Sequence, residues 1–224
     1  MLRITRRTFL AGTAGFLAAG ALPSVGKPRV TVASTTKAAS SMKFNLEQFI
    51  ADVKQARTES DSQAAVQEVI ARAVAEPGSV LRELGEPKEA GIQTLYHDDA
   101  VSIFNIVWAP LMVLIPHNHL MWATIGIYTG REDNILWERT GPRIEAATAA
   151  SLSEREVFSL PDTAIHSVTN PANRLTGAIH VYGGDLTTAK LSQWDAETLR
   201  ERPFDIEEGR RFFREANERL RGGR

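Results

Sequence analysis

The sequence predicts a mainly β domain, a sandwich or barrel, with helices before it and a single helix after it. Between residues 92 and 187 the chain consists of short runs rich in β-branched and aromatic residues, punctuated by Gly, Pro, Asn and Asp. The preceding segment and the C-terminal segment instead carry apolar residues at helical spacing. No region alternates strands with helices, as a parallel α/β sheet would require.

The helices are predicted from apolar residues three and four positions apart. Residues 44–58 form one such amphipathic stretch, and a second runs from an N-cap at Ser60–Ser62 to about Ala75, before a Pro-Gly pair. A short helical turn follows over 79–84, and the C-terminal helix is predicted over 206–220. We interpret these helices as packing elements around the β core.

The predicted strands are short, and several are bounded by turn residues such as Asp98-Asp99 and Thr140-Gly141-Pro142. They cover residues 94–96, 100–108, 112–115, 121–128, 134–138, 156–159, 165–168 and 176–182. We therefore expect a single domain over 44–224, with helices in 44–90, a β-barrel in 92–187 and a C-terminal tail and helix in 188–224.

Composition excludes several classes of function. The chain has 224 residues, 43% of them hydrophobic and 24% charged, with a formal net charge of −1. There is no basic stripe for nucleic acid. The absence of cysteine excludes disulfides, thiolate metal sites and a cysteine nucleophile, and no G-x-S-x-G supports a serine hydrolase.

The first 26 residues are predicted to be a twin-arginine signal peptide. Arg6-Arg7 is followed by Phe9-Leu10 and by an uncharged, Ala- and Gly-rich run that is too short for a good membrane span. An ordinary Sec signal is the alternative. We expect an exported, periplasmic protein that meets the twin-arginine machinery transiently and has no stable membrane insertion after signal removal. Residues 27–43 are predicted to be a linker.

The candidate metal ligands are His117, His119 and His166. Side chains two positions apart on a strand share a face, so the H-x-H pair projects both imidazoles to one side. A third imidazole from a later strand would close a three-nitrogen face around one divalent ion, leaving coordination positions open.

These segments resemble the two motifs of the cupin superfamily. The first is Pro116-His117-Asn118-His119 with Gly130 eleven residues later, and the second is Pro161-x4-His166-x3-Asn170. Further pieces are similar to bacterial members of the cysteine dioxygenase (thiol dioxygenase) family: Val107–Pro110, Trp122 with Gly130–Glu132, and Ala178–Leu186. The resemblance implies a cupin double-stranded β-helix, a jelly-roll barrel, over about residues 92–187.

The resemblance also implies chemistry. The three histidines would hold Fe(II), although Ni, Co, Mn or Zn would also be accepted by these ligands. The carboxylate that most cupins place after the H-x-H is replaced by Ala123 and Thr124, which leaves a three-His site. In the family a Ser-x-His-x-Tyr triad acts on the bound substrate or oxygen, which implies catalytic roles for His180 and Tyr182, with Ala178 in place of the serine.

Substrate recognition departs from the family pattern. The arginine that would bind a substrate carboxylate is missing from the stretch Leu95–Asp99. This makes cysteine and 3-mercaptopropionate doubtful substrates. Tyr96, His97 and Trp122 are the candidate substrate-binding residues, whereas Arg131 and Arg139 are predicted to be solvent-facing charges at strand ends.

The sequence-based hypothesis is a mononuclear non-haem iron dioxygenase that oxidises a small thiol to a sulfinate with O2. Two alternatives stay open. One is a three-His cupin metalloenzyme that acts on a carbon substrate, and the other is a non-catalytic periplasmic ligand-binding cupin, which the missing arginine and serine would favour.

Overall fold

The computed structural model describes residues 31–34 and 43–222, and within them two antiparallel sheets face each other as a double-stranded β-helix. One sheet has the order β1 (Thr31–Ser34), β8 (Glu156–Leu160), β5 (Ala123–Thr129), β10 (Thr176–Tyr182), β3 (Ser102–Trp108) and β2 (Gly91–His97). The other has the order β12 (Glu201–Pro203), β11 (Ser192–Trp194), β4 (Val113–Asn118), β9 (Ile165–Thr169), β6 (Arg131–Thr140) and β7 (Arg143–Ser153). The mainly β jelly-roll barrel predicted from the sequence is confirmed.

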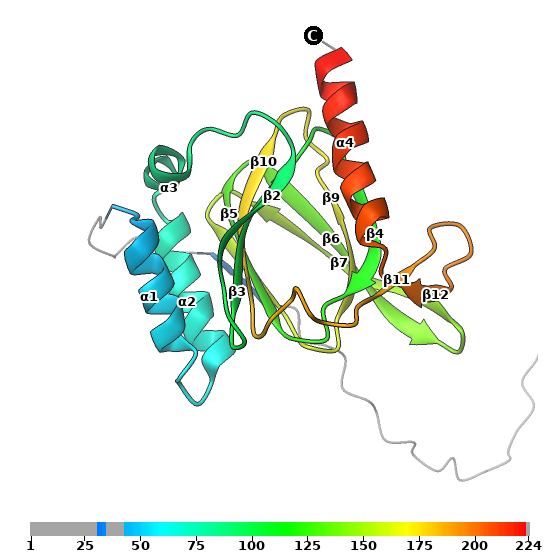
Figure 1. The fold of residues 1–224 in the computed structure, drawn as a ribbon, viewed down its shortest axis with the longest axis horizontal. Helices are drawn as coiled ribbons and strands as arrows, with labels where there is room; N and C mark the ends of the chain where they lie inside the picture. The colour runs from blue at the N-terminus through cyan, green and yellow to red at the C-terminus, as the bar shows by residue number, and fades with distance from the viewer. Residues whose placement is uncertain (1–30, 35–42, 223–224) are drawn as a thin grey trace, which may run out of the picture.

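The predicted helices are confirmed as α1 (Leu46–Ala56), α2 (Ser62–Val74), α3 (Pro77–Leu84) and α4 (Ile206–Gly222). The side chains of Asn45 and Asp61 cap α1 and α2, each accepting a hydrogen bond from a backbone N–H of the first turn. Figure 1 shows α1 to α3 gathered on one side of the barrel and α4 on the other. The helices therefore lie outside the barrel and do not fill its interior.

The described residues form three apolar clusters, and the two larger ones both include residues of the first sheet. One lies between the sheets, and the other lies between α1 to α3 and the outer face of the first sheet, where α2 packs on β5 and β8. At the opposite side, α4 contributes Phe213, whose ring stacks on Trp108 with 5.5 Å between centroids. No helix in the part of the chain that the structure describes is long and apolar enough to cross a membrane.

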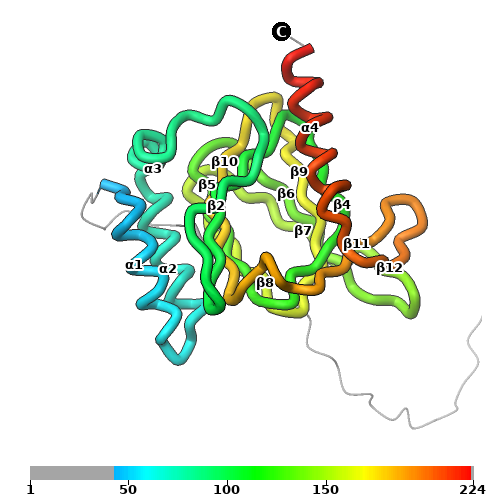
Figure 2. Tube along the Cα trace, viewed as in Figure 1, coloured from blue at the N-terminus to red at the C-terminus, as the bar shows by residue number. Residues whose placement is uncertain are grey.

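Three sequence-based boundaries are corrected. The linker predicted over 27–43 is interrupted by β1, which pairs antiparallel with β8. A long strand, β7, was missed because its Ala-rich sequence has low β propensity; it is held by pairing with β6 along its length. The short strands β11 and β12 lie in the predicted tail and join the second sheet beside β4, as Figure 2 shows. The predicted signal peptide, 1–26, lies outside the described residues.

The turn glycine of the first motif has a clear structural reason. Gly130 adopts a positive φ of 83° between β5 and β6, and a Cβ there would lie 2.2 Å from the Oγ1 of Thr176. That hydroxyl accepts from Arg131 N and donates to Arg131 O. The glycine therefore fixes where β6 begins, and with it which β6 side chains enter the barrel.

Candidate metal centre

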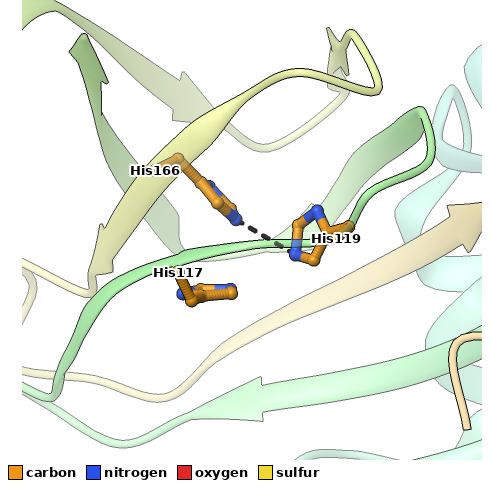
Figure 3. Close-up of side chains that lie close together, drawn as sticks. All are labelled: His117, His119 and His166. Atoms are coloured by element: carbon orange, nitrogen blue, oxygen red, sulfur yellow. Dashed lines mark hydrogen bonds between the residues drawn. The ribbon is translucent and has the colours of Figure 1, made fainter. Parts of the chain in front are cut away.

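The three predicted ligands converge inside the barrel. His117 lies on β4 and His119 directly follows it, while His166 lies on β9 as the direct cross-strand partner of His117. One ring nitrogen from each histidine falls within 4.8 Å of the others. All three side chains are buried, and Figure 3 shows their rings facing a common point from two strands. The chain therefore has a three-His group that could hold a metal ion.

Hydrogen bonds orient two of these imidazoles for ligation. The Nδ1 atom of His117 is 2.9 Å from the carbonyl oxygen of Ile115, and that of His166 is 2.7 Å from Oδ1 of Asn134. Both acceptors require an N–H, so the proton of each ring lies on Nδ1 and the Nε2 lone pair faces the centre.

The nitrogens also have suitable spacing for a metal. The Nε2 atoms of His166 and His119 are 3.3 Å apart. Two imidazole nitrogens bound to one zinc-like ion at the usual bond length lie about 3 to 3.4 Å apart. Facing nitrogen lone pairs repel each other unless a cation lies between them, so the donor set fits a divalent ion.

Electrostatics keep these histidines neutral. The pKa of His117 is lowered from an ordinary value of 6.5 to about 4, mainly by burial and to a smaller extent by His180, while the Ile115 carbonyl and Glu132 act in the opposite direction. Burial also lowers the pKa of His119 and His166 well below the ordinary value, with neighbouring imidazoles adding to the effect. Neutral imidazole is the form that binds a metal ion.

A fully buried carboxylate, Glu132, stands behind the centre and was missed as a functional residue. Its Oε1 accepts a hydrogen bond from Nδ2 of Asn134 at 3.0 Å, and its Oε2 accepts from Nε1 of Trp108 at 2.7 Å. Because Asn134 also binds His166, the carboxylate is linked to a candidate ligand through one amide side chain. Positions 132 and 134 are inward on β6, so a polar pair on an otherwise buried strand face was the available signal.

The same carboxylate faces His180. The Oε2 of Glu132 lies 3.5 Å from Nε2 of His180, and the Nδ1 of His180 lies 3.3 Å from the hydroxyl of Tyr182. Burial raises the pKa of Tyr182, and the charge of Glu132 raises it further. The Tyr182 ring packs against His119 with 4.8 Å between centroids. A Glu-His-Tyr series therefore ends beside the three-His group, where the sequence predicted only the histidine and the tyrosine.

A pocket of about 900 Å³ opens onto the three histidines, and His180 and Tyr182 also line it. The residues predicted to bind substrate lie elsewhere. Tyr96 hydrogen-bonds Asp98 and Lys54, Trp122 packs in the core beside the helices, and His97 is exposed. None of the three lines this pocket. Their predicted role finds no support in its geometry.

Other predicted features have ordinary structural explanations. Asn170 of the second motif donates to the backbone carbonyls of Trp108, Ala109 and Arg174, so it braces a turn. Arg131 and Arg139 are exposed and pair with Asp133 and Glu201, as expected for strand-end charges. Ala123 and Thr124, which follow the H-x-H pair and carry no carboxylate, are fully buried on β5.

No family model matches the chain. Similar solved structures include a cupin superfamily protein from Desulfitobacterium hafniense, with TM-score 0.36, 15% identity and coverage of 45% of this chain and 84% of that one. An RmlC-like cupin family protein from Methanocaldococcus jannaschii has TM-score 0.38, 15% identity and coverage of 45% and 85%. Bacillus subtilis oxalate decarboxylase, described with Mn(II) centres, has TM-score 0.39, 13% identity and coverage of 48% and 29%. Likenesses at this level carry no argument about metal or reaction; the barrel is defined by its own sheet topology.

Proposed function

We propose that this chain is a mononuclear metal-dependent dioxygenase that oxidises a thiol to a sulfinate. The observation that carries the proposal is the neutral three-nitrogen face of His117, His119 and His166, which opens into an apolar pocket beside Tyr182. No carboxylate joins the ligand atoms in the described residues. A divalent ion in such a site keeps its full charge and favours an anionic sulfur ligand.

Iron(II) is the proposed ion, and it would supply the activation of dioxygen, which no side chain can provide. The overall reaction is R–SH + O2 → R–SO2H. Both oxygen atoms form bonds to sulfur, the O–O bond breaks, and sulfur gives four electrons to oxygen. The thiol proton leaves sulfur and ends on the sulfinic acid, so no external reductant is needed.

The Glu-His-Tyr series would manage that proton. The carboxylate of Glu132 favours a proton on Nε2 of His180, which leaves Nδ1 to accept one from the Tyr182 hydroxyl. When the thiol loses its proton, Tyr182 relays it to His180 at Nδ1, and Glu132 balances the resulting imidazolium charge. The apolar walls exclude water from the reacting sulfur.

The pocket also supports a second candidate, a three-His metalloenzyme that oxidises a carbon substrate. Its volume of about 900 Å³ and its aromatic lining residues Phe104, Trp108 and Phe204 would hold a molecule much larger than an amino acid. The two candidates share the metal centre and differ in the atom that is oxidised.

Oxygen uptake by iron-loaded protein distinguishes them. We expect thiol-dependent uptake with one O2 consumed per sulfinate formed, and no uptake with the zinc-loaded protein. His166→Ala should abolish both iron retention and uptake, whereas His97→Ala, which changes an exposed histidine, should preserve both. Stable iron binding without turnover of any thiol would reject the thiol reaction, and uptake with a diketone or flavonol would favour the second candidate.

A further inference from the structure

The walls of the pocket are mainly apolar. Phe104, Ile106 and Trp108 project from alternate positions of β3, so they share one face, and Leu114 and Val168 face them from the second sheet. A volume of about 900 Å³ lies near the upper end of the range for sites that enclose a drug-sized ligand. The interior therefore suits an extended apolar body.

The apolar lining continues to the mouth. Leu186 and Leu191, from the segment between β10 and β11, and Phe204, between β12 and α4, also line the pocket. Ile92 and Ile206 also line the pocket and are each 58% exposed. Large aliphatic side chains left in water at the rim of a pocket are typical of a surface that receives an apolar ligand.

Glu201 and Arg202, two of the three charged residues that line the pocket besides the histidines, are already paired. Glu201 binds Arg139 through two contacts, and Arg202 contacts Glu208, which also accepts a hydrogen bond from Gln193. Lys190 is the lining cation without an ion pair in the described residues, and its side chain is exposed at the rim. A carboxylate next to a reacting sulfur would find no unpaired arginine to hold it.

We propose that the substrate is an alkyl or aryl thiol whose hydrocarbon body fills this pocket and which carries no carboxylate beside its sulfur. This inference rests on the proposed thiol chemistry. It replaces the small thiol of the sequence-based hypothesis by a larger apolar one, with the sulfur at the three-His face and the hydrocarbon between Ile106 and Leu191.

Binding to the full chain loaded with redox-inert zinc tests the inference without turnover. Calorimetry would compare straight-chain thiols from ethanethiol to octanethiol, alcohols of the same lengths, cysteine and 3-mercaptopropionate. Each buried methylene should tighten binding about fourfold. Hexanethiol should bind more tightly than hexanol, because only the thiol can give the metal a thiolate, and more tightly than cysteine.

The outcomes separate the two proposals. Affinity that does not rise with chain length, or cysteine binding more tightly than hexanethiol, would overturn the apolar substrate while leaving thiol chemistry intact. If thiols and alcohols of the same length bind with equal affinity, and both affinities rise equally with chain length, the apolar pocket is supported and thiol ligation to the metal is rejected.

A matched pair of variants locates the binding. Leu191→Asp places a charge in the pocket wall at a half-buried position outside the main apolar clusters, and Leu111→Asp makes the same change at an exposed turn outside the pocket. The first should weaken octanethiol binding about tenfold, the equivalent of nearly two methylenes, and leave ethanethiol and zinc content unchanged. Leu111→Asp should leave the binding of both thiols and the zinc content unchanged. An equal loss of octanethiol binding in both variants would contradict the placement of the hydrocarbon in this pocket.

Discussion

The Oδ1 atom of Asn134 lies 2.7 Å from Nδ1 of His166, and the amide nitrogen of the same asparagine donates to Glu132 at 3.0 Å. Because the amide uses both of its ends, its orientation is fixed by the buried carboxylate, and the tautomer of His166 follows from that orientation. Glu132, two positions before Asn134 on β6, thus determines through Asn134 which nitrogen of His166 faces the centre.

Replacing Asn134 by Leu should weaken metal binding about 10- to 100-fold, because His166 loses the acceptor that holds its Nδ1 proton. Competition with a chelator of known affinity measures the change. Asn105→Leu is the matched control, since it removes a buried asparagine that accepts from the Tyr128 hydroxyl outside the metal network. Equal metal affinities in the two variants would refute the orienting role.

Glu132→Gln should destabilise the protein by about 1 to 3 kcal/mol. Each carboxylate oxygen accepts one hydrogen bond, from Trp108 or from Asn134. When one oxygen becomes an NH2 group, which cannot accept, one of these two buried donors loses its acceptor. Urea unfolding measures the difference. Glu138→Gln, at an exposed position of the same strand, should stay within about 0.5 kcal/mol of the parent, and a similar cost at both positions would count against the network.

Tyr182→Phe should lower thiol-dependent oxygen uptake on the order of 10²-fold while the protein keeps its metal. The change removes only the hydroxyl that lies 3.3 Å from His180 and keeps the ring against His119. Tyr128→Phe serves as the control, because its buried hydroxyl binds Asn105 and does not line the pocket. Undiminished uptake in the Tyr182 variant would remove the proton relay from the mechanism.

The metal-free protein should lose stability as the pH falls from 6.5 towards 4. The pKa of His117 is lowered from 6.5 to about 4, so in this window the unfolded chain binds the proton and the folded chain does not. Acid therefore favours unfolding, and His117 alone accounts for about 2 kcal/mol between pH 8 and pH 5. His119 and His166 are shifted in the same direction and add to the effect.

Urea unfolding at a series of pH values measures this dependence. His97→Gln, which removes an exposed histidine, should leave the slope unchanged. A flat profile between pH 7 and pH 5 would mean that the folded and unfolded states bind protons equally, so that folding does not lower the pKa of the three imidazoles.

Local sequence was sufficient for much of the fold. The period-two pattern and the turn residues located most strands of the barrel, and apolar spacing located the four helices that the structure describes. It was insufficient for β7, whose Ala-rich stretch becomes a strand because β6 pairs with it, and for β1, whose pairing with β8 joins residues more than a hundred positions apart. A strand that forms because it pairs with another strand need not show an alternating apolar pattern in its own sequence.

The candidate site shows the same difference between what local sequence predicts and what the tertiary structure adds. The sequence alone determined that His117, His119 and His166 form a set, because strand alternation places the first two on one face and the motif spacing supplies the third. Only the tertiary structure decided what surrounds them. Glu132 meets Trp108, Asn134 and His180 because β6 and β10 lie in opposite sheets that close around one interior. The pocket walls likewise come from both sheets and α4, and a chemical environment assembled from separate strands exists only once those strands are packed.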